Sequence, residues 1–277
     1  MILVRPIDNL DLPELRPYRT MRYQHEQRSQ GIFVAEGEKV VRRLIESPLT
    51  VLSVMLPEKW LPEYQRLLAP RSEDITIYVG PKELLETLIG FSMYQGVLAV
   101  GRVPPQPTLE ELLRRAQPPR LLVATEGMSN SLNMGALVRN CAAFSVDALL
   151  VSEACCSPFI RRAVRASMGT VFRLPTLELT SLRETLGHLR QQGFHLVAAH
   201  PHADRRTLAQ ADLRGDCCLV LGSEGEGLSE AVLDLCHEHV AIPMPPDVDS
   251  LNVASASAVF LYEAARQRGT ARQPAGS

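Results

Sequence analysis

The fold is decided by residues 218–229, which read CLVLGSEGEGLS. The apolar residues at the start predict a buried strand, and the glycines that follow predict a tight turn opening a helix over residues 229–236. The same alternation predicts further strands at residues 121–125, 148–151, 196–199 and 239–242, and helices at residues 134–144, 182–192 and 252–268. Because these strands are continuous apolar runs, they favour a mainly parallel sheet covered on both faces, in an α/β domain.

A smaller α/β domain is predicted ahead of this one. Residues 33–45 indicate a strand that runs into a helix, and residues 81–89 indicate a helix with proline in its first turn. Short strands are expected at residues 51–56, 75–79 and 96–100. A Pro-rich linker over residues 104–119 holds one short helix, with Thr108 as its N-cap. We therefore predict two domains, over residues 1–103 and 120–277.

The composition is that of an ordinary globular protein. Its 277 residues are 45% hydrophobic and 22% charged, which excludes a disordered chain and a collagen-like fibre. No apolar run reaches about 18 residues, the length that a membrane helix needs, and the first residues lack the pattern of a secretion signal. The adjacent pairs Cys155-Cys156 and Cys217-Cys218 do not form a disulfide framework, so we expect a reducing, cytoplasmic setting.

Net charge does not identify a ligand. It is −2, without the basic excess that is typical of nucleic-acid-binding proteins. All but three of the 29 basic side chains are Arg, which fits either a GC-rich genome or recognition of phosphates by guanidinium groups. Local clusters of basic residues have to decide between these two explanations.

The glycine-rich loop after the strand at 218–221 is the first candidate site. Gly222 and Gly227 have the spacing of a P-loop, but Leu228 stands where the lysine should be, and the Gly-x-Gly-x-x-Gly pattern is absent. A nucleotide-dependent enzyme of the Rossmann type is therefore disfavoured. Since Glu224 and Glu226 would repel a bare phosphate, the loop suits a cationic or zwitterionic ligand, unless it is a plain tight turn.

Two further segments follow strands, at the edge where open α/β sheets bind ligands. Residues 133–140, NMGALVRN, place Asn133 near a helix start and Arg139 within the helix. Residues 242–254, IPMPPDVDSLNVA, place Ser250 just before a helix of small residues. Each segment also has a plain structural interpretation, with Asn133 or Ser250 as an N-cap and Arg139 as a solvated surface side chain.

Taken together, the three segments resemble the three motifs of the SpoU (TrmH) RNA 2′-O-ribose methyltransferases, within the SPOUT class. Asn133-x-Gly135-x-x-x-Arg139 corresponds to the first motif, residues 221–228 to the second, and residues 242–244 followed by 250–254 to the third. The similarity spans about residues 119–268, with Ser145 where the family usually has Gly. The N-terminal half resembles the L30e-like substrate-binding domain often fused to this enzyme, at Arg28, Phe33, Glu36-Gly37 and Gln95-Gly96-Val97.

This resemblance implies a fold, a cofactor and an assembly. The C-terminal α/β domain would form a deep trefoil knot, which would hold S-adenosylmethionine in a bent form. The residues that would bind this cofactor are Leu221, Gly222, Gly227, Ile242, Met244, Leu251 and Asn252. Family members usually act as homodimers, joined through the C-terminal domain with the active site at the interface.

The resemblance also implies the residues that carry the reaction. The family's matching Arg is proposed as the base, but arginine side chains normally stay protonated. We therefore expect Arg139 to bind the target phosphate or to stabilise the developing alkoxide, and to accept the proton late. Asn133, Glu224, Ser250 and Asn252 would orient Arg139 and the substrate by hydrogen bonds.

An RNA substrate needs basic side chains to meet its phosphates. The densest cluster is Arg161, Arg162 and Arg165, which would share one face of a helix. A second patch is expected in the N-terminal domain, at Arg28, Arg42 and Arg43 with Arg22. Both clusters are equally typical of solvated helix faces.

The leading hypothesis is an S-adenosylmethionine-dependent RNA 2′-O-ribose methyltransferase, acting on ribosomal RNA in preference to transfer RNA. The alternative from another class is a non-catalytic RNA-binding protein that retains the knotted fold. Zinc could be suggested by His200 and His202 or by Cys236, His237 and His239, but the chain has no Cys-x-x-Cys pair, and we expect no metal.

Overall fold

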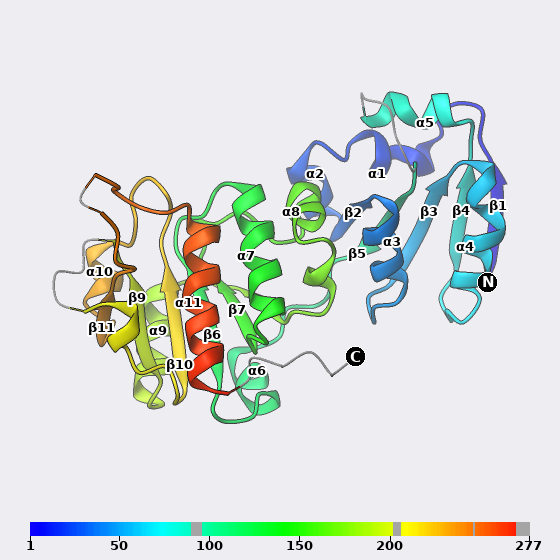
Figure 1. Cartoon of the computed structure of the whole chain (residues 1–277). Helices are drawn as coiled ribbons and strands as arrows, with labels where there is room; N and C mark the ends of the chain where they lie inside the picture. Colours follow the sequence, from blue (N-terminus) through cyan, green and yellow to red (C-terminus); the bar gives the residue numbers. More distant parts are fainter. Residues whose placement is uncertain (90–95, 202–205, 246, 270–277) are drawn as a thin grey trace, which may run out of the picture. The chain divides into compact units, whose positions relative to one another are not determined.

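The computed structural model describes residues 1–89, 96–201, 206–245 and 247–269, and the chain divides into two units (Figure 1). The first unit consists of Met1–Pro105 together with Phe159–Arg173, and the second of Gln106–Pro158 together with Leu174–Ser277. The segment 159–173 thus packs with the N-terminal unit, although it lies inside the second predicted domain. Gln95 and His202, named in the sequence predictions, lie outside the described residues.

The first unit is built on a mixed five-stranded sheet in the order β1-β4-β3-β5-β2. Strands β1 and β3 run parallel to β4, whereas β5 runs antiparallel to both β3 and β2. The strands are β1 (Ile2–Pro6), β2 (Ile32–Glu36), β3 (Val51–Leu56), β4 (Ile75–Val79) and β5 (Leu98–Arg102). The strand predicted over residues 96–100 therefore begins two residues later, and β1 was not predicted.

Short helices surround this sheet. They are η1 (Pro13–Leu15), α1 (Arg16–Arg19), α2 (Gln24–Ser29), α3 (Glu38–Ile45), η2 (Glu58–Trp60), α4 (Leu61–Leu68), α5 (Lys82–Ile89), α8 (Arg161–Ala166) and η3 (Thr170–Phe172). One hydrophobic cluster joins Leu15 and Tyr18 to Val34 and Met55 of the sheet. The predicted passage from a strand into a helix over residues 33–45 is confirmed by β2 and α3.

Segment 159–173 is attached to β2 by aromatic and ionic contacts. The Phe33 ring lies 5.3 Å from the ring of Phe159 and 5.4 Å from that of Phe172, between ring centroids. The Glu36 carboxylate, only 6% exposed, accepts hydrogen bonds from Arg161 and, at 2.6 Å, from Arg165. A buried carboxylate paired with two guanidinium groups is strongly favoured over the same carboxylate alone.

We expect Glu36→Gln to lower the free energy of unfolding by about 2 kcal/mol, since it leaves the largely buried Arg161 guanidinium without its counter-charge. Urea denaturation measures this loss. The matched control is Glu46→Gln at an exposed carboxylate after α3, which should change stability by less than about 0.5 kcal/mol. Equal stabilities for the two variants would show that the Glu36 pairs contribute nothing net.

The second unit is built on a six-stranded sheet in the order β11-β9-β10-β6-β7-β8, and every described strand pair in it is parallel. The predicted parallel α/β class is thereby confirmed. The strands are β6 (Leu121–Thr125), β7 (Ala148–Val151), β8 (Thr176–Glu178), β9 (His195–Ala199), β10 (Cys217–Leu221) and β11 (Glu238–Val240). The chain leaves β6 toward β7 but leaves β10 toward β11. The carboxyl ends of these two neighbouring strands therefore form a topological switch point, where ligands bind in such sheets.

Helices cover both faces of this sheet (Figure 1). On one face α7 (Ser131–Ala143) and α11 (Val253–Gln267) lie side by side. On the other, α6 (Leu109–Arg115), α9 (Leu182–Gln191) and α10 (Glu230–Leu233) pack on alternate strand residues such as Leu122 and Val220. The short η4 (Leu208–Gln210) contacts α11. Leu112 and Leu113 of α6 are buried in this core, so the helix predicted inside the linker is a packed element of the second unit.

Helix ends were predicted with mixed success. Thr108 caps α6 in a reciprocal capping box with Glu111, as expected. The helix expected over residues 229–236 ends at Leu233, because His237 exchanges hydrogen bonds with the Leu196 backbone and leads into β11. Ser145 adopts a φ of 56°, which explains why a related sequence would favour Gly there.

Candidate functional site

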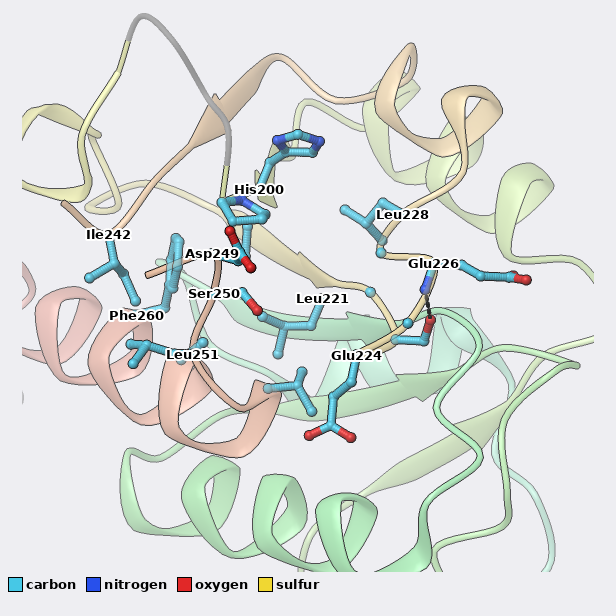
Figure 2. Close-up of a pocket in the computed structure, with 18 of the residues that line it drawn as sticks. His200, Leu221, Glu224, Glu226, Leu228, Ile242, Asp249, Ser250, Leu251 and Phe260 are labelled. Atoms are coloured by element: carbon cyan, nitrogen blue, oxygen red, sulfur yellow. Dashed lines mark hydrogen bonds between the residues drawn. The ribbon is translucent and has the colours of Figure 1, made fainter. Parts of the chain in front are cut away.

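A cavity of about 420 Å³ lies at the carboxyl ends of β9, β10 and β11 (Figure 2). Three chain segments that are far apart in the sequence line it: the end of β9, the loop after β10, and the stretch from β11 into α11. Six of the seven residues predicted to bind a cofactor are in its lining, namely Leu221, Gly222, Gly227, Ile242, Met244 and Leu251. Their contact with a cofactor stays a prediction.

The loop after β10 is a closed hairpin. Ser223 and Gly227 exchange backbone hydrogen bonds of 3.1 and 3.2 Å, and the Ser223 hydroxyl accepts one from the Glu226 amide. Gly227 has a φ of 69°, which glycine adopts without strain. A Cβ atom added to Gly222 would lie 2.2 Å from the carbonyl carbon of Gly227. Both glycines are therefore required by the shape of the loop, whatever it binds.

Asn252 joins the three predicted motifs. Its side-chain oxygen accepts hydrogen bonds from the amides of Ala254 and Ser255 and so caps α11. Its amide nitrogen donates to the Asn133 side-chain oxygen at 3.1 Å and to the Glu224 carboxylate. One side chain therefore links α7, the glycine-rich loop and α11.

Two predicted caps are corrected by these contacts. Ser250 does not cap α11, because Asn252 does; Ser250 is exposed and lines the cavity instead. Asn133 does not cap α7, because the Asn130 side chain accepts from the amides of Leu132 and Asn133. Ser, Asn and Asp are all good caps, so residue type alone could not choose between near neighbours.

The lining of the cavity is acidic. It includes Glu224, Glu226 and Asp249, together with His200, and among the described residues that line it there is neither Arg nor Lys. Figure 2 shows the side chains of Glu224 and Glu226 leaving the loop in different directions. This lining favours a ligand that carries positive charge and disfavours a polyphosphate, in agreement with the prediction from the loop sequence.

A second cavity of about 350 Å³ shares the loop with the first. Residues 127–130 and Asn133 line one side of it, and Ser223, Glu224, Gly225, Glu226 and Val253 the other. Because these last five residues also line the first cavity, they form a wall between the two. We call residues 223–226 the shared wall.

Arg139 lies apart from both cavities. It is exposed on α7, and it lies six residues beyond Asn133, about 9 Å further along the helix. The next residue, Asn140, points inward and donates to the Ala254 carbonyl at 2.7 Å and to the Ser257 hydroxyl. The fold of a single chain therefore gathers Asn133, Glu224 and Asn252 but does not bring Arg139 to them. Sequence reasoning missed Asn140, whose signal was a polar residue on a packed helix face.

The predicted RNA-binding arginines lie in the first unit, and several contact acidic groups. Arg161 and Arg165 pair with Glu36, whereas Arg162 is exposed. Arg42 pairs with Glu38 and Glu63, and Arg43 donates to the Met168 carbonyl. Arg28 is exposed in α2. Contact of these residues with RNA stays a prediction.

Two of the partly or fully buried cysteines are held in the thiol form. Burial raises the pKa of the Cys156 thiol to about 11 and that of Cys217 to about 12, so both thiols stay protonated at neutral pH. Within the described residues, no three His, Cys, Asp or Glu side chains gather as a metal site would require. The described helices include none with the length and hydropathy to cross a bilayer.

Comparison with known proteins identifies relatives of this architecture. The model of the SpoU rRNA Methylase family matches residues 120–262. An uncharacterized tRNA/rRNA methyltransferase of Mycobacterium tuberculosis is 34% identical over 240 residues, covering 86% of this chain and 82% of that protein. A 23S rRNA (guanosine-2′-O-)-methyltransferase of Xanthomonas campestris is 35% identical over 67% of this chain and 76% of that protein.

A solved structure has the same fold over almost the whole chain. It is the SpoU methyltransferase AviRb from Streptomyces viridochromogenes in complex with AdoMet, with a TM-score of 0.79 and 25% identity. The match covers 94% of this chain and 100% of that chain.

Proposed function

Because this chain belongs to the SpoU rRNA methylase family, we propose that it transfers a methyl group from S-adenosylmethionine to a ribose 2′-hydroxyl of RNA. One observation carries the proposal: Asn252 ties Asn133 and Glu224 together at the wall between two neighbouring cavities. A methyl donor in one cavity and an acceptor in the other would meet at this wall, and such alignment supplies much of the catalysis in a transfer reaction.

The chemistry of the first cavity fits S-adenosylmethionine. Its volume lies in the range of small-molecule sites. Leu221, Ile242 and Phe260 offer apolar surface to an adenine ring, and the acidic lining suits the positive sulfonium and ammonium groups. When bound, the cofactor supplies an activated methyl group. The chain's own part is to hold it by the glycine-rich loop and by the stretch from β11 to α11.

The second cavity suits the nucleoside that accepts the methyl group. Most of its described lining residues are polar or acidic, with Met128 and Val253 as apolar members and neither Arg nor Lys among them, so the phosphates of the RNA would lie outside it. Asn133 and Ser129 offer hydrogen-bonding groups to a ribose. In this proposal the hydrogen-bonded side chains of Asn133, Asn252 and Glu224 orient the 2′-hydroxyl toward the methyl group.

A second copy of the chain would complete the site. Leu132 of α7 and Val259 and Tyr262 of α11 are 57%, 39% and 55% exposed, an apolar surface on the two helices that lie side by side. Exposed apolar side chains on adjoining helices are compatible with an interface between copies of the chain. Arg139 is exposed on α7 as well. We propose a homodimer through these helices, in which Arg139 of one copy reaches the cavities of the other and stabilises the developing alkoxide.

The proposed substrate is a guanosine of 23S ribosomal RNA, which is the target of the Xanthomonas relative. Transfer RNA is the second candidate. The test incubates the purified protein with S-adenosylmethionine and, separately, with ribosomal and transfer RNA from cells that lack the gene. We expect 2′-O-methylguanosine to appear in digested ribosomal RNA by mass spectrometry. Tight cofactor binding without methylation of either RNA would contradict this function and support a non-catalytic RNA-binding protein.

A further inference from the structure

We propose that Glu126 is a positioning residue for the reaction, which fixes the shared wall by holding the glycine-rich loop at both ends. Glu126 directly follows β6, at the switch point beside β10. Neither the motif comparison nor the lining of either cavity includes it. The expected effect of Glu126 on cofactor binding rests on the proposed function, whereas its effect on the position of the loop does not.

Glu126 contacts the two residues that flank the loop, Leu221 before it and Ser229 after it. Its backbone amide donates to the Leu221 carbonyl at 2.9 Å, where the loop begins. Its carboxylate accepts from the Ser229 amide and from the Ser229 hydroxyl, each at 2.8 Å, where the loop ends. A single residue just after the neighbouring strand β6 thus closes the loop of residues 222–228.

These contacts determine where the shared wall stands. Within the loop, hydrogen bonds join Ser223 only to Glu226 and Gly227, so they shape the hairpin but do not orient it against the sheet. Glu224 meets Asn252 on one flank of the loop, and Glu126 holds Ser229 on the other. Because the wall borders both cavities, a displacement of the Ser229 end changes both cavities at once.

The hydrogen bonds between Glu126 and Ser229 indicate that Glu126 positions the loop and does not act on the substrate. Both carboxylate oxygens of Glu126 accept hydrogen bonds from Ser229, so the group is engaged in holding the loop. A glutamine at this position could accept from the Ser229 amide through its oxygen and donate to the Ser229 hydroxyl through its nitrogen. An alanine could do neither, and a charge-assisted pair of hydrogen bonds would be lost.

The test compares Glu126→Ala, Glu126→Gln and Ser229→Ala, with Glu230→Ala as the matched control on the exposed first residue of α10. Binding of S-adenosylhomocysteine is measured by calorimetry. We expect Glu126→Ala to raise its Kd about tenfold, and Glu126→Gln and Glu230→Ala to stay within about twofold of the parent protein. Ser229→Ala, which keeps the amide contact, should raise Kd about threefold.

A second readout needs no cofactor. Amide hydrogen exchange in the ligand-free protein should show the Ser229 amide at least about tenfold less protected in Glu126→Ala, and restored in Glu126→Gln. Unchanged protection in Glu126→Ala would overturn the inference. If the parent protein binds no S-adenosylhomocysteine, the proposed function fails, and the exchange result still decides the role of Glu126. If Glu126→Ala does not fold, an unaltered Kd in Ser229→Ala, which loses the hydroxyl contact to Glu126, would overturn the inference.

Discussion

Arg139→Ala is expected to lower the rate of methyl transfer about 100- to 1,000-fold, the effect of removing one donor that stabilises developing negative charge. Arg139 is exposed and lines neither cavity of its own chain. The Kd for S-adenosylhomocysteine should therefore stay within about twofold. Single-turnover methylation of RNA with labelled cofactor, alongside calorimetry, separates the two effects. Arg183→Ala, at an exposed arginine of α9, is the matched control. Near-normal turnover of Arg139→Ala would remove this residue from the mechanism.

The same variant decides which copy supplies the guanidinium. Consider a mixed dimer in which one copy carries Arg139→Ala and the other keeps Arg139 but cannot bind cofactor. If the arginine acts across the interface, the first copy binds the cofactor and receives Arg139 from the second, so one site is complete. An arginine acting within its own chain leaves none. Recovery of activity on mixing two inactive proteins is therefore expected. Absence of recovery, with mixed dimers present in a native mass spectrum, would contradict the proposed arrangement.

Gly222→Ala is expected to weaken S-adenosylhomocysteine binding by about 100-fold. This variant therefore serves as the chain that cannot bind cofactor in the mixed-dimer experiment. The added Cβ would lie 2.2 and 2.4 Å from the carbonyl carbon and oxygen of Gly227, and 2.6 Å from the Leu228 nitrogen. These are backbone atoms, which cannot rotate away as a side chain would, so the hairpin must open or shift. Calorimetry of the purified variant measures the loss.

Gly225 offers a control in the same loop. A Cβ added there meets no atom within 4 Å. Gly225→Ala should therefore weaken binding by less than about fivefold, although Gly225 also borders the cavity. Similar affinities for the two alanine variants would show that the close approach of Gly222 to Gly227 does not shape the binding site.

Five of the six strands in the sheet of the second unit were predicted, whereas β8 was not. The predicted runs at residues 121–125 and 148–151 have the bounds of β6 and β7, and β9 and β10 differ by one residue at the start. Strands buried on both faces are continuous apolar segments, a local signal that needs no knowledge of their partners. The end of α10 could not be predicted in this way, because it depends on the contact between His237 and the Leu196 backbone, far away in sequence.

The site was predictable as a set of segments but not as a set of contacts. Motif spacing pointed to Asn133, Glu224 and Asn252, but only the folded chain joins them through one amide nitrogen. Arg161 and Arg165 illustrate the opposite case. The sequence indicates a cluster of basic residues, whereas their pairing with a carboxylate 125 and 129 residues away follows from tertiary structure alone.

The placement of segment 159–173 has a consequence for dissecting this protein. A fragment ending at Pro105 would lack α8, leaving Phe33 without two of its aromatic neighbours and Glu36 without its counter-ions. A chimera that exchanges the family-matched half for that of a relative would likewise import foreign side chains into the N-terminal fold. The two halves of the gene therefore cannot be recombined at the proline-rich stretch without also redesigning β2.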